Sequence, residues 1–190
     1  MNSEKQTIRL AELKDLTSIV EIYNLSIPGR LATADTEPVS VESRLEWFHS
    51  HKGNRPLYVV EETVGSTGSA IKTNSTNKTN LTNLTNTTNI IAFLSFKSFY
   101  GRPAYSITAE IGIYIHPNHQ KKGLGKILLQ KAIDISPELK LENLVGFIFG
   151  HNEPSIKLFR NFGFTEWGTL KEVGKMDGKY VDLIIFGRKI

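Results

Sequence analysis

The sequence has no cysteine among its 190 residues. Disulfide bonds, thiolate metal sites and a cysteine nucleophile are therefore excluded. The chain also has no apolar run near the roughly 20 residues that a membrane helix needs. Its first residues, Met1 to Lys5, contain no apolar core of a signal peptide. We expect a cytoplasmic protein that does not bind a membrane.

The sequence also has no large excess of positive or negative charge. Lys and Arg number 23 against 19 Asp and Glu, so the formal net charge is only +4, and no five like charges follow one another. This pattern gives no support for a nucleic-acid partner. The five histidines do not stand at ligand spacing with carboxylates. We therefore expect no metal.

The pattern of apolar residues predicts an α/β (α+β) fold. Strands are expected near residues 8–11, 57–61, 90–97, 107–116, 144–149, 164–170 and 180–188. Helices are expected after Asp15, whose side chain can cap the first of them, after Ser40, at 124–136 and at 155–162. Strands that alternate with helices in the second half indicate βαβ units. A hairpin in the middle indicates antiparallel pairing. The prediction is one domain, residues 1–190, with a mixed twisted β-sheet and helices on both faces.

The segment from about 65 to 89 differs in composition from the rest of the chain. It consists mainly of Asn, Thr, Ser and Gly, and Thr-Asn recurs at a three-residue step. Such a segment has too few apolar residues to offset the entropy of ordering it. We interpret it as a low-complexity loop insertion at the tip of a hairpin.

The clearest local signal for chemistry is the turn from Gln120 to Lys126, between a strand and an amphipathic helix. Gly123 and Gly125 permit a tight turn, and the first N–H groups and the dipole of the following helix favour a phosphate. An ordinary strand-to-helix turn with solvated lysines is the alternative. Two other glycine motifs do not match this turn. The dinucleotide-binding motif G-x-G-x-x-G lacks its third glycine, because Leu128 stands at that position, and the Walker motif G-x-x-x-x-G-K-[ST] lacks its first glycine.

Two blocks of the sequence resemble the GNAT superfamily of acetyltransferases. Residues 113–125 are similar to its acetyl-CoA motif, Q/R-x-x-G-x-G/A after the central strand. Residues 152–164 are similar to its N-x-x-S/A…G-F segment. The resemblance covers the chain apart from the Asn/Thr-rich segment. It implies an acyl-CoA N-acyltransferase fold and acetyl-CoA as the co-substrate.

Three further segments resemble the phosphinothricin N-acetyltransferase family: residues 36–38, 105–110 and 174–182. This resemblance implies a homodimer and a small amino-acid-like amine acceptor, such as phosphinothricin, methionine sulfone or methionine sulfoximine. It assigns the general base to Glu110. The cofactor-binding residues that it implies are Ile113, Tyr114 and Ile115 on the strand, Lys121, Lys122, Gly123, Leu124, Gly125 and Lys126 in the turn, and Asn152.

The chemistry of Glu110 also suits this role. It lies ten residues before the Gln120 turn, near the expected end of the acetyl thioester, and a carboxylate there can take a proton from an ammonium. A solvated glutamate on a strand is the alternative. Asn152 can instead cap a helix that begins near Pro154. Phe159 stands where many GNAT enzymes have a tyrosine that protonates the leaving thiolate. Phenylalanine cannot donate a proton, so the general acid stays unassigned.

Two other functions remain open at this stage. The acceptor can be a different amine, such as a polyamine or a protein N-terminus, or the chain can be a non-catalytic acyl-CoA-binding module. Arg30, Lys97 and Arg102 lie in loops or at strand ends where they can reach the anion of an amino-acid acceptor, although each can also be a plain surface charge.

Overall fold

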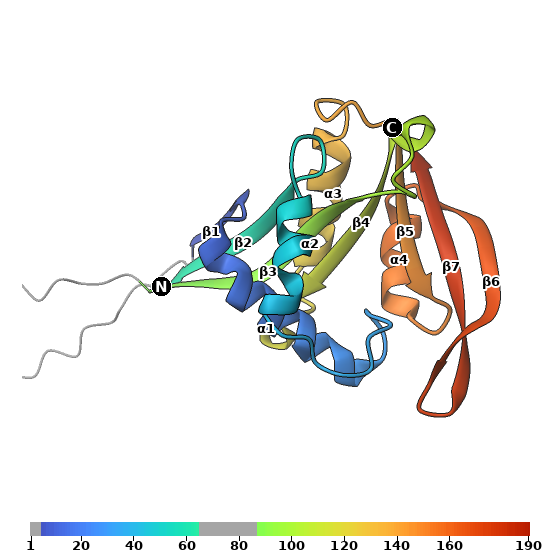
Figure 1. The fold of residues 1–190 in the computed structure, drawn as a ribbon, viewed down its shortest axis with the longest axis horizontal. Coiled ribbons are helices and arrows are strands. Elements are labelled where there is room, and N and C mark those ends of the chain that lie inside the picture. The colour runs from blue at the N-terminus through green and yellow to red at the C-terminus, as the bar shows by residue number, and fades with distance from the viewer. Residues whose placement is uncertain (1–4, 65–86) are drawn as a thin grey trace, which may run out of the picture.

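A seven-stranded mixed sheet forms the centre of the protein. The structure is a computed structural model and describes residues 5–64 and 87–190. The strands lie in the order β1-β2-β3-β4-β5-β7-β6 (Figure 1). Only β4 and β5 pair in parallel, and the other neighbours pair antiparallel. The bounds are β1 Lys5–Leu10, β2 Leu57–Val64, β3 Thr87–Ser98, β4 Thr108–Ile115, β5 Asn143–Phe149, β6 Thr165–Met176 and β7 Lys179–Lys189.

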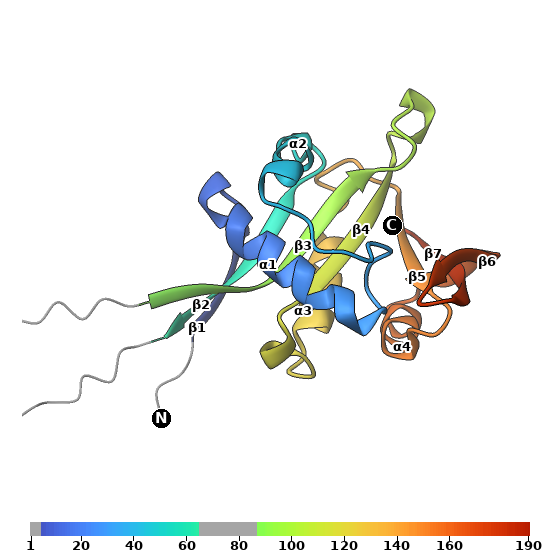
Figure 2. The same cartoon turned by 60° about the horizontal axis from the view of Figure 1, so that its bottom comes forward.

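Helices cover both faces of this sheet (Figures 1 and 2). On one face, α1 (Leu16–Ser26) and α2 (Leu45–Ser50) pack on a cluster that includes Val59 of β2 and Phe93 of β3. On the other face, α3 (Leu124–Ile135) and α4 (Glu153–Asn161) pack on the larger cluster. The predicted fold class is confirmed. None of the helices in the described ranges is long and apolar enough to cross a membrane.

The helix periodicity explains how α3 joins the core. Its buried residues recur three and four positions apart, which places them on one side of the helix: Leu124, Leu128, Leu129, Ala132 and Ile135. They contact Ile111, Ile113 and Ile115 of β4, which the alternation of the strand places on the same face. Tyr114 points to the opposite face and packs under α1. This arrangement buries both sides of β4.

Several expected boundaries differ in the structure; β1 begins three residues earlier than expected and β2 ends three residues later. β3 begins at Thr87, so residues 87–89 belong to a strand rather than to the predicted insertion, and they pair with residues 62–64 of β2. Threonine is β-branched and suits a strand, which explains why a Thr/Asn sequence continues the ladder. Residues 65–86 of the predicted insertion lie outside the described residues. β6 continues six residues beyond its expected end, past a register shift between Leu170 and Gly174 that interrupts the alternation.

The prediction that the Asp15 side chain caps α1 is wrong. A short 3-10 turn, Leu13–Asp15, precedes α1, and the Asp15 side chain makes no cap hydrogen bond to that helix. Its carboxylate accepts the backbone N–H of Glu12 at 2.8 Å and the Arg9 guanidinium at 2.6 and 3.0 Å instead. The Arg9 guanidinium donates two hydrogen bonds to this carboxylate and brings a full opposite charge, which a backbone N–H at the start of α1 does not.

Candidate active site

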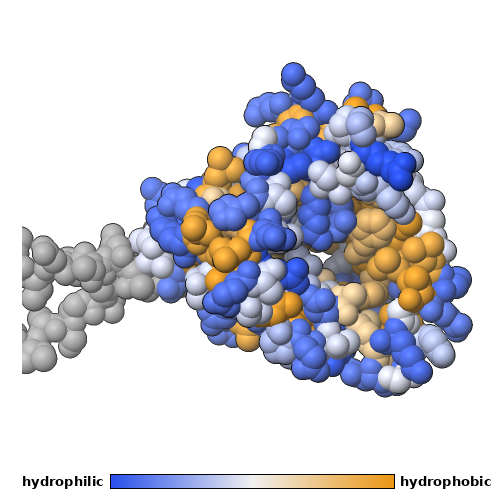
Figure 3. All heavy atoms as spheres, viewed as in Figure 1, coloured by the Kyte–Doolittle hydropathy of each residue, from blue (hydrophilic) through white to orange (hydrophobic). Residues whose placement is uncertain are grey.

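The candidate site is a notch where β4 and β5 diverge. The parallel ladder joins only residues 108–110 to residues 143–145, with Glu110 opposite Val145 as its last pair. Beyond Glu110 the two strands pair only with their other neighbours, β3 and β7. Figure 1 shows them separating from this point, and Figure 3 shows the surface hollowed there. The notch, lined by residues of 110–115 and 146–148, holds a cavity of about 170 Å³. Its strand edges offer free backbone groups to an extended ligand.

The glycine turn lies at one end of the notch. Gly123 is the N-cap of α3 and has φ +89°, a left-handed conformation that glycine adopts without strain. The first N–H groups of α3 have no partner within the helix, and the helix dipole makes this end positive. Gly125 lines the notch directly. Lys121, Lys122 and Lys126 are exposed around the turn, so the turn is suited to a phosphate group.

Glu110 lies at the inner end of the notch, beside the last β4–β5 pair. Its side chain is about a quarter exposed, and its Oε1 accepts a hydrogen bond from Lys97 Nζ at 3.0 Å. Lys97 is the β3 residue directly opposite Glu110. A carboxylate in this position can accept a proton from a bound amine. Glu110 is thus partly buried and paired with Lys97.

Asn152 lines the notch and is buried. Its Oδ1 accepts the N–H of Ser155 at 3.1 Å and so caps α4, as the alternative interpretation of this residue proposed. Its Nδ2 donates to the carbonyl of Leu31 at 2.9 Å. His151 Nε2 lies 2.8 Å from the carbonyl of Arg30. These two contacts hold the loop after α1 against the mouth of the notch.

A second, smaller cavity of about 70 Å³ adjoins the notch on the α1 side. Phe93 and Tyr114 stack in its wall with ring centroids 4.8 Å apart. Arg44 lies over the Tyr23 ring at 4.8 Å and pairs with Asp35 at 2.6 Å. Burial raises the pKa of the Tyr23 and Tyr114 phenols, so both stay protonated. Its lining is Ile19, Val20, Tyr23, Arg44, Trp47, Phe93, Ser95, Lys97 and Tyr114.

The structure brings together only some of the residues singled out in the sequence. Six of the eleven residues assigned to catalysis or to acetyl-CoA line the notch: Glu110, Ile113, Tyr114, Ile115, Gly125 and Asn152. Lys121, Lys122, Gly123, Leu124 and Lys126 belong to the turn at its end, and the Leu124 side chain is in the core, so only its backbone faces a ligand. Of the three candidate cations, Lys97 reaches the notch, whereas Arg30 pairs with Asp177.

Sequence reasoning singled out Lys97 and Tyr114 but missed the other residues of the small cavity, although some of them carried a signal. Tyr23 lies on the apolar stripe of α1, where a phenol needs a hydrogen-bond partner. Its Oη donates to Asp35 Oδ2 at 2.7 Å. Trp47 and Arg44 carried no comparable signal, because only the packing of the 40–50 segment on β3 brings them to the cavity.

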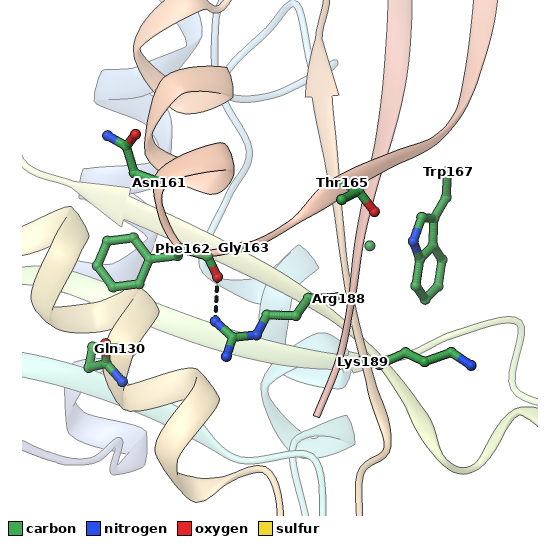
Figure 4. A pocket seen from close by; sticks show the side chains of 9 residues that line it. Gln130, Asn161, Phe162, Gly163, Thr165, Trp167, Arg188 and Lys189 are labelled. Carbon is green, nitrogen blue, oxygen red and sulfur yellow. Dashed lines mark hydrogen bonds between the residues drawn. The ribbon is translucent and has the colours of Figure 1, made fainter.

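A larger hollow, about 780 Å³, lies elsewhere and shares no residue with the notch. It is open, and Figure 4 shows Arg188 reaching the backbone carbonyl of Phe162 beside it, with the Trp167 ring standing apart. Within residues 5–64 and 87–190 no three His, Asp or Glu side chains gather as metal ligands would. The notch therefore remains the place where a carboxylate, free strand edges and a phosphate-type turn meet.

Comparisons with known proteins show what this chain is similar to. Residues 19–164 match the acetyltransferase (GNAT) family. The "Putative phosphinothricin acetyltransferase YwnH" of Bacillus subtilis is 47% identical over 97% of this chain and 99% of its own length. The L-methionine sulfoximine/L-methionine sulfone acetyltransferase of Salmonella typhimurium is 31% identical over 93% of this chain and 90% of its own. A Sinorhizobium meliloti phosphinothricin acetyltransferase solved in complex with acetyl-CoA has a TM-score of 0.78 at 27% identity, covering 97% and 88% of the two chains.

Proposed function

This chain belongs to the GNAT acetyltransferase family, and from that premise we propose that it transfers the acetyl group of acetyl-CoA to the amine of a small amino-acid-like acceptor. Phosphinothricin, methionine sulfone and methionine sulfoximine represent the acceptor class, since relatives are named for them. The observation that carries the proposal is the notch between β4 and β5 with Glu110 at its inner end.

The residues around the notch suit acetyl-CoA. The N–H groups at the start of α3 and the lysines Lys121, Lys122 and Lys126 would hold the diphosphate. The free edge of Ile113–Ile115 would take the pantetheine through backbone hydrogen bonds, as an added strand does. Asn152 keeps α4 and the loop after α1 in place around it. When bound, acetyl-CoA supplies the acetyl group as a thioester.

Glu110 is proposed as the general base. The acceptor arrives as an ammonium and becomes a nucleophile only when it loses a proton, which the Glu110 carboxylate takes directly or through one water. The amine then attacks the thioester carbonyl in a direct transfer. A strand N–H in the notch would stabilise the oxyanion. Phe159, which lines the notch, cannot protonate the departing thiolate, so water is the proposed donor.

The experiment that tests this function is release of free thiol from acetyl-CoA in the presence of different amines. We expect turnover with phosphinothricin, methionine sulfone or a related small amino acid. We expect little turnover with peptides or polyamines, because the relatives are named for small amino-acid-like acceptors. Turnover of peptides or polyamines alone would overturn the acceptor class, and failure to bind acetyl-CoA would overturn the function itself. The cytoplasmic location expected from the sequence stays a prediction.

We also propose that the enzyme is a homodimer in which the second copy covers β6. This strand is one of the two edges of the sheet, and its apolar side chains Trp167, Leu170 and Val173 are exposed by 44 to 58%. An uncovered apolar edge strand is an association surface. Light scattering of the purified protein tests this, and Val173→Lys should shift the protein towards the monomer. A wild-type monomer would refute the proposal.

A further inference from the structure

Lys97 occupies a distinctive position between the two cavities. Among the residues that the structure describes, only Lys97 and Tyr114 line both the notch and the small cavity beside it. Lys97 comes from β3 and Glu110 from β4, and the register of the ladder sets them directly opposite each other. Their side chains are 41% and 27% exposed, and Nζ lies 3.0 Å from Oε1. An ion pair this accessible is weak and opens readily.

The other cation of the small cavity is already neutralised. Arg44 pairs with Asp35 at 2.6 Å and lies against the Tyr23 ring. Among the described ion pairs, Lys97 has Glu110 as its partner and no other carboxylate. If Glu110 turns to the ammonium of an acceptor, the Lys97 ammonium loses its counter-charge next to that acceptor. A simple amine would then leave two cations side by side at one carboxylate.

A zwitterion resolves this conflict. An α-amino acid carries an ammonium and a carboxylate on the same carbon, so its two charges complement the two charges of the opened Lys97–Glu110 pair. The ammonium goes to Glu110 and the carboxylate to Lys97, and both charged groups keep a partner as they lose water. We infer that Lys97 selects acceptors with an anion beside the amine and rejects simple amines. This inference rests on the proposed function and names the residue that sets its substrate class.

The test compares an α-amino acid acceptor with the same molecule lacking its carboxylate, for the wild type, Lys97→Met and Lys97→Arg. We expect the ratio of kcat/KM for the acid to that for the amine to fall about 10- to 100-fold in Lys97→Met, as the loss of one charge-assisted hydrogen bond implies. The change should appear mainly in KM, because the carboxylate is held equally before and during transfer. Lys97→Arg should restore most of the ratio. Lys171→Met, which removes an exposed lysine paired with Asp182, should leave the ratio unchanged.

Calorimetry provides a readout without turnover. Binding of the amino acid to the protein saturated with coenzyme A should weaken by a similar factor in Lys97→Met, while affinity for coenzyme A stays constant. An unchanged ratio and unchanged affinity would overturn the inference, as would an equal loss with both acceptors, which would make Lys97 a partner of Glu110 alone. Failure of the proposed function looks different, because the wild type would then bind no acetyl-CoA.

Discussion

The Phe159 ring of α4 lies directly against the backbone of Gly146 in β5. A Cβ at Gly146 would stand 2.9 Å from Cζ of Phe159 and closer still to its Cε1. The same ring packs on Phe164 with centroids 4.8 Å apart. Gly146 and Phe159 both line the notch. The absence of a side chain at Gly146 therefore lets α4 approach the sheet beside the proposed acetyl-CoA site.

Gly146→Ala should consequently destabilise the protein and weaken acetyl-CoA binding together. The added methyl forces the Phe159 ring to move, and overpacking of this kind costs about 1–3 kcal/mol. Denaturant unfolding and calorimetric titration with acetyl-CoA measure the two effects. Gly29→Ala is the matched control, because a Cβ there meets nothing within 4 Å. Equal results for the two variants would contradict the packing argument.

Gly123→Ala should weaken acetyl-CoA binding for a different reason. An alanine at φ +89° is strained by about 1–2 kcal/mol. The backbone would relieve this strain by shifting the turn that begins α3. Gly178 is a suitable control because it also has positive φ, +81°, and open space around it, but lies in the β6–β7 turn. Gly178→Ala should cost similar stability with unchanged acetyl-CoA affinity. A normal affinity in Gly123→Ala would show that the turn does not hold the diphosphate.

Local patterns predicted much of this fold. The isoleucine alternation of β4 and the spacing of Leu124 and Leu128 in α3 depend on neighbours a few residues away, so the sequence alone contains them. The contact of Lys97 with Glu110 depends on the register of two strands, and the partner of Asp15 depends on where β1 lies. Such choices between partners are decided by tertiary structure, which is why the cap predicted at Asp15 is wrong and why most residues of the small cavity were not predicted.

We propose that the whole chain acts as one domain and that the Asn/Thr-rich segment is dispensable. Excising residues 66–86 and joining β2 to β3 by a short turn should leave acetyl-CoA binding intact, because longer loops add little closure entropy, about 0.6 kcal/mol per doubling of length. Since β3 begins at Thr87, the excision stops before it. Circular dichroism and calorimetry check the shortened protein. Loss of folding or of binding would show that the segment is structural.

Acid should remove the stabilisation that Asp15 gives. Burial raises the pKa of this carboxyl, but hydrogen bonds from Arg9 and the N–H of Glu12 outweigh burial and lower the pKa below its ordinary 3.8. A lowered carboxyl pKa stabilises the fold above about pH 4, and this contribution disappears as the pH falls through the folded-state pKa. Asp15→Asn should cost about 2 kcal/mol at pH 7. Unfolding free energies at several pH values should show this difference shrinking in acid, and a constant difference would contradict the assignment.

Glu110→Gln is the sharpest test of the proposed chemistry. The substitution keeps the shape of the side chain and its place opposite Lys97 on the ladder, but removes the base. The carboxamide of glutamine cannot accept the proton of an ammonium, whereas the carboxylate of Glu110 can.

We expect kcat to fall about 10²- to 10⁴-fold, which corresponds to about 3–5 kcal/mol of barrier. Acetyl-CoA affinity should barely change, because the turn before α3 and the edge of β4 are proposed to hold it. Glu138→Gln, in the exposed turn after α3, should leave both quantities unchanged. A loss in Glu110→Gln below about tenfold at every pH would mean that water or another group takes the proton, and loss of acetyl-CoA binding would make Glu110 a structural residue.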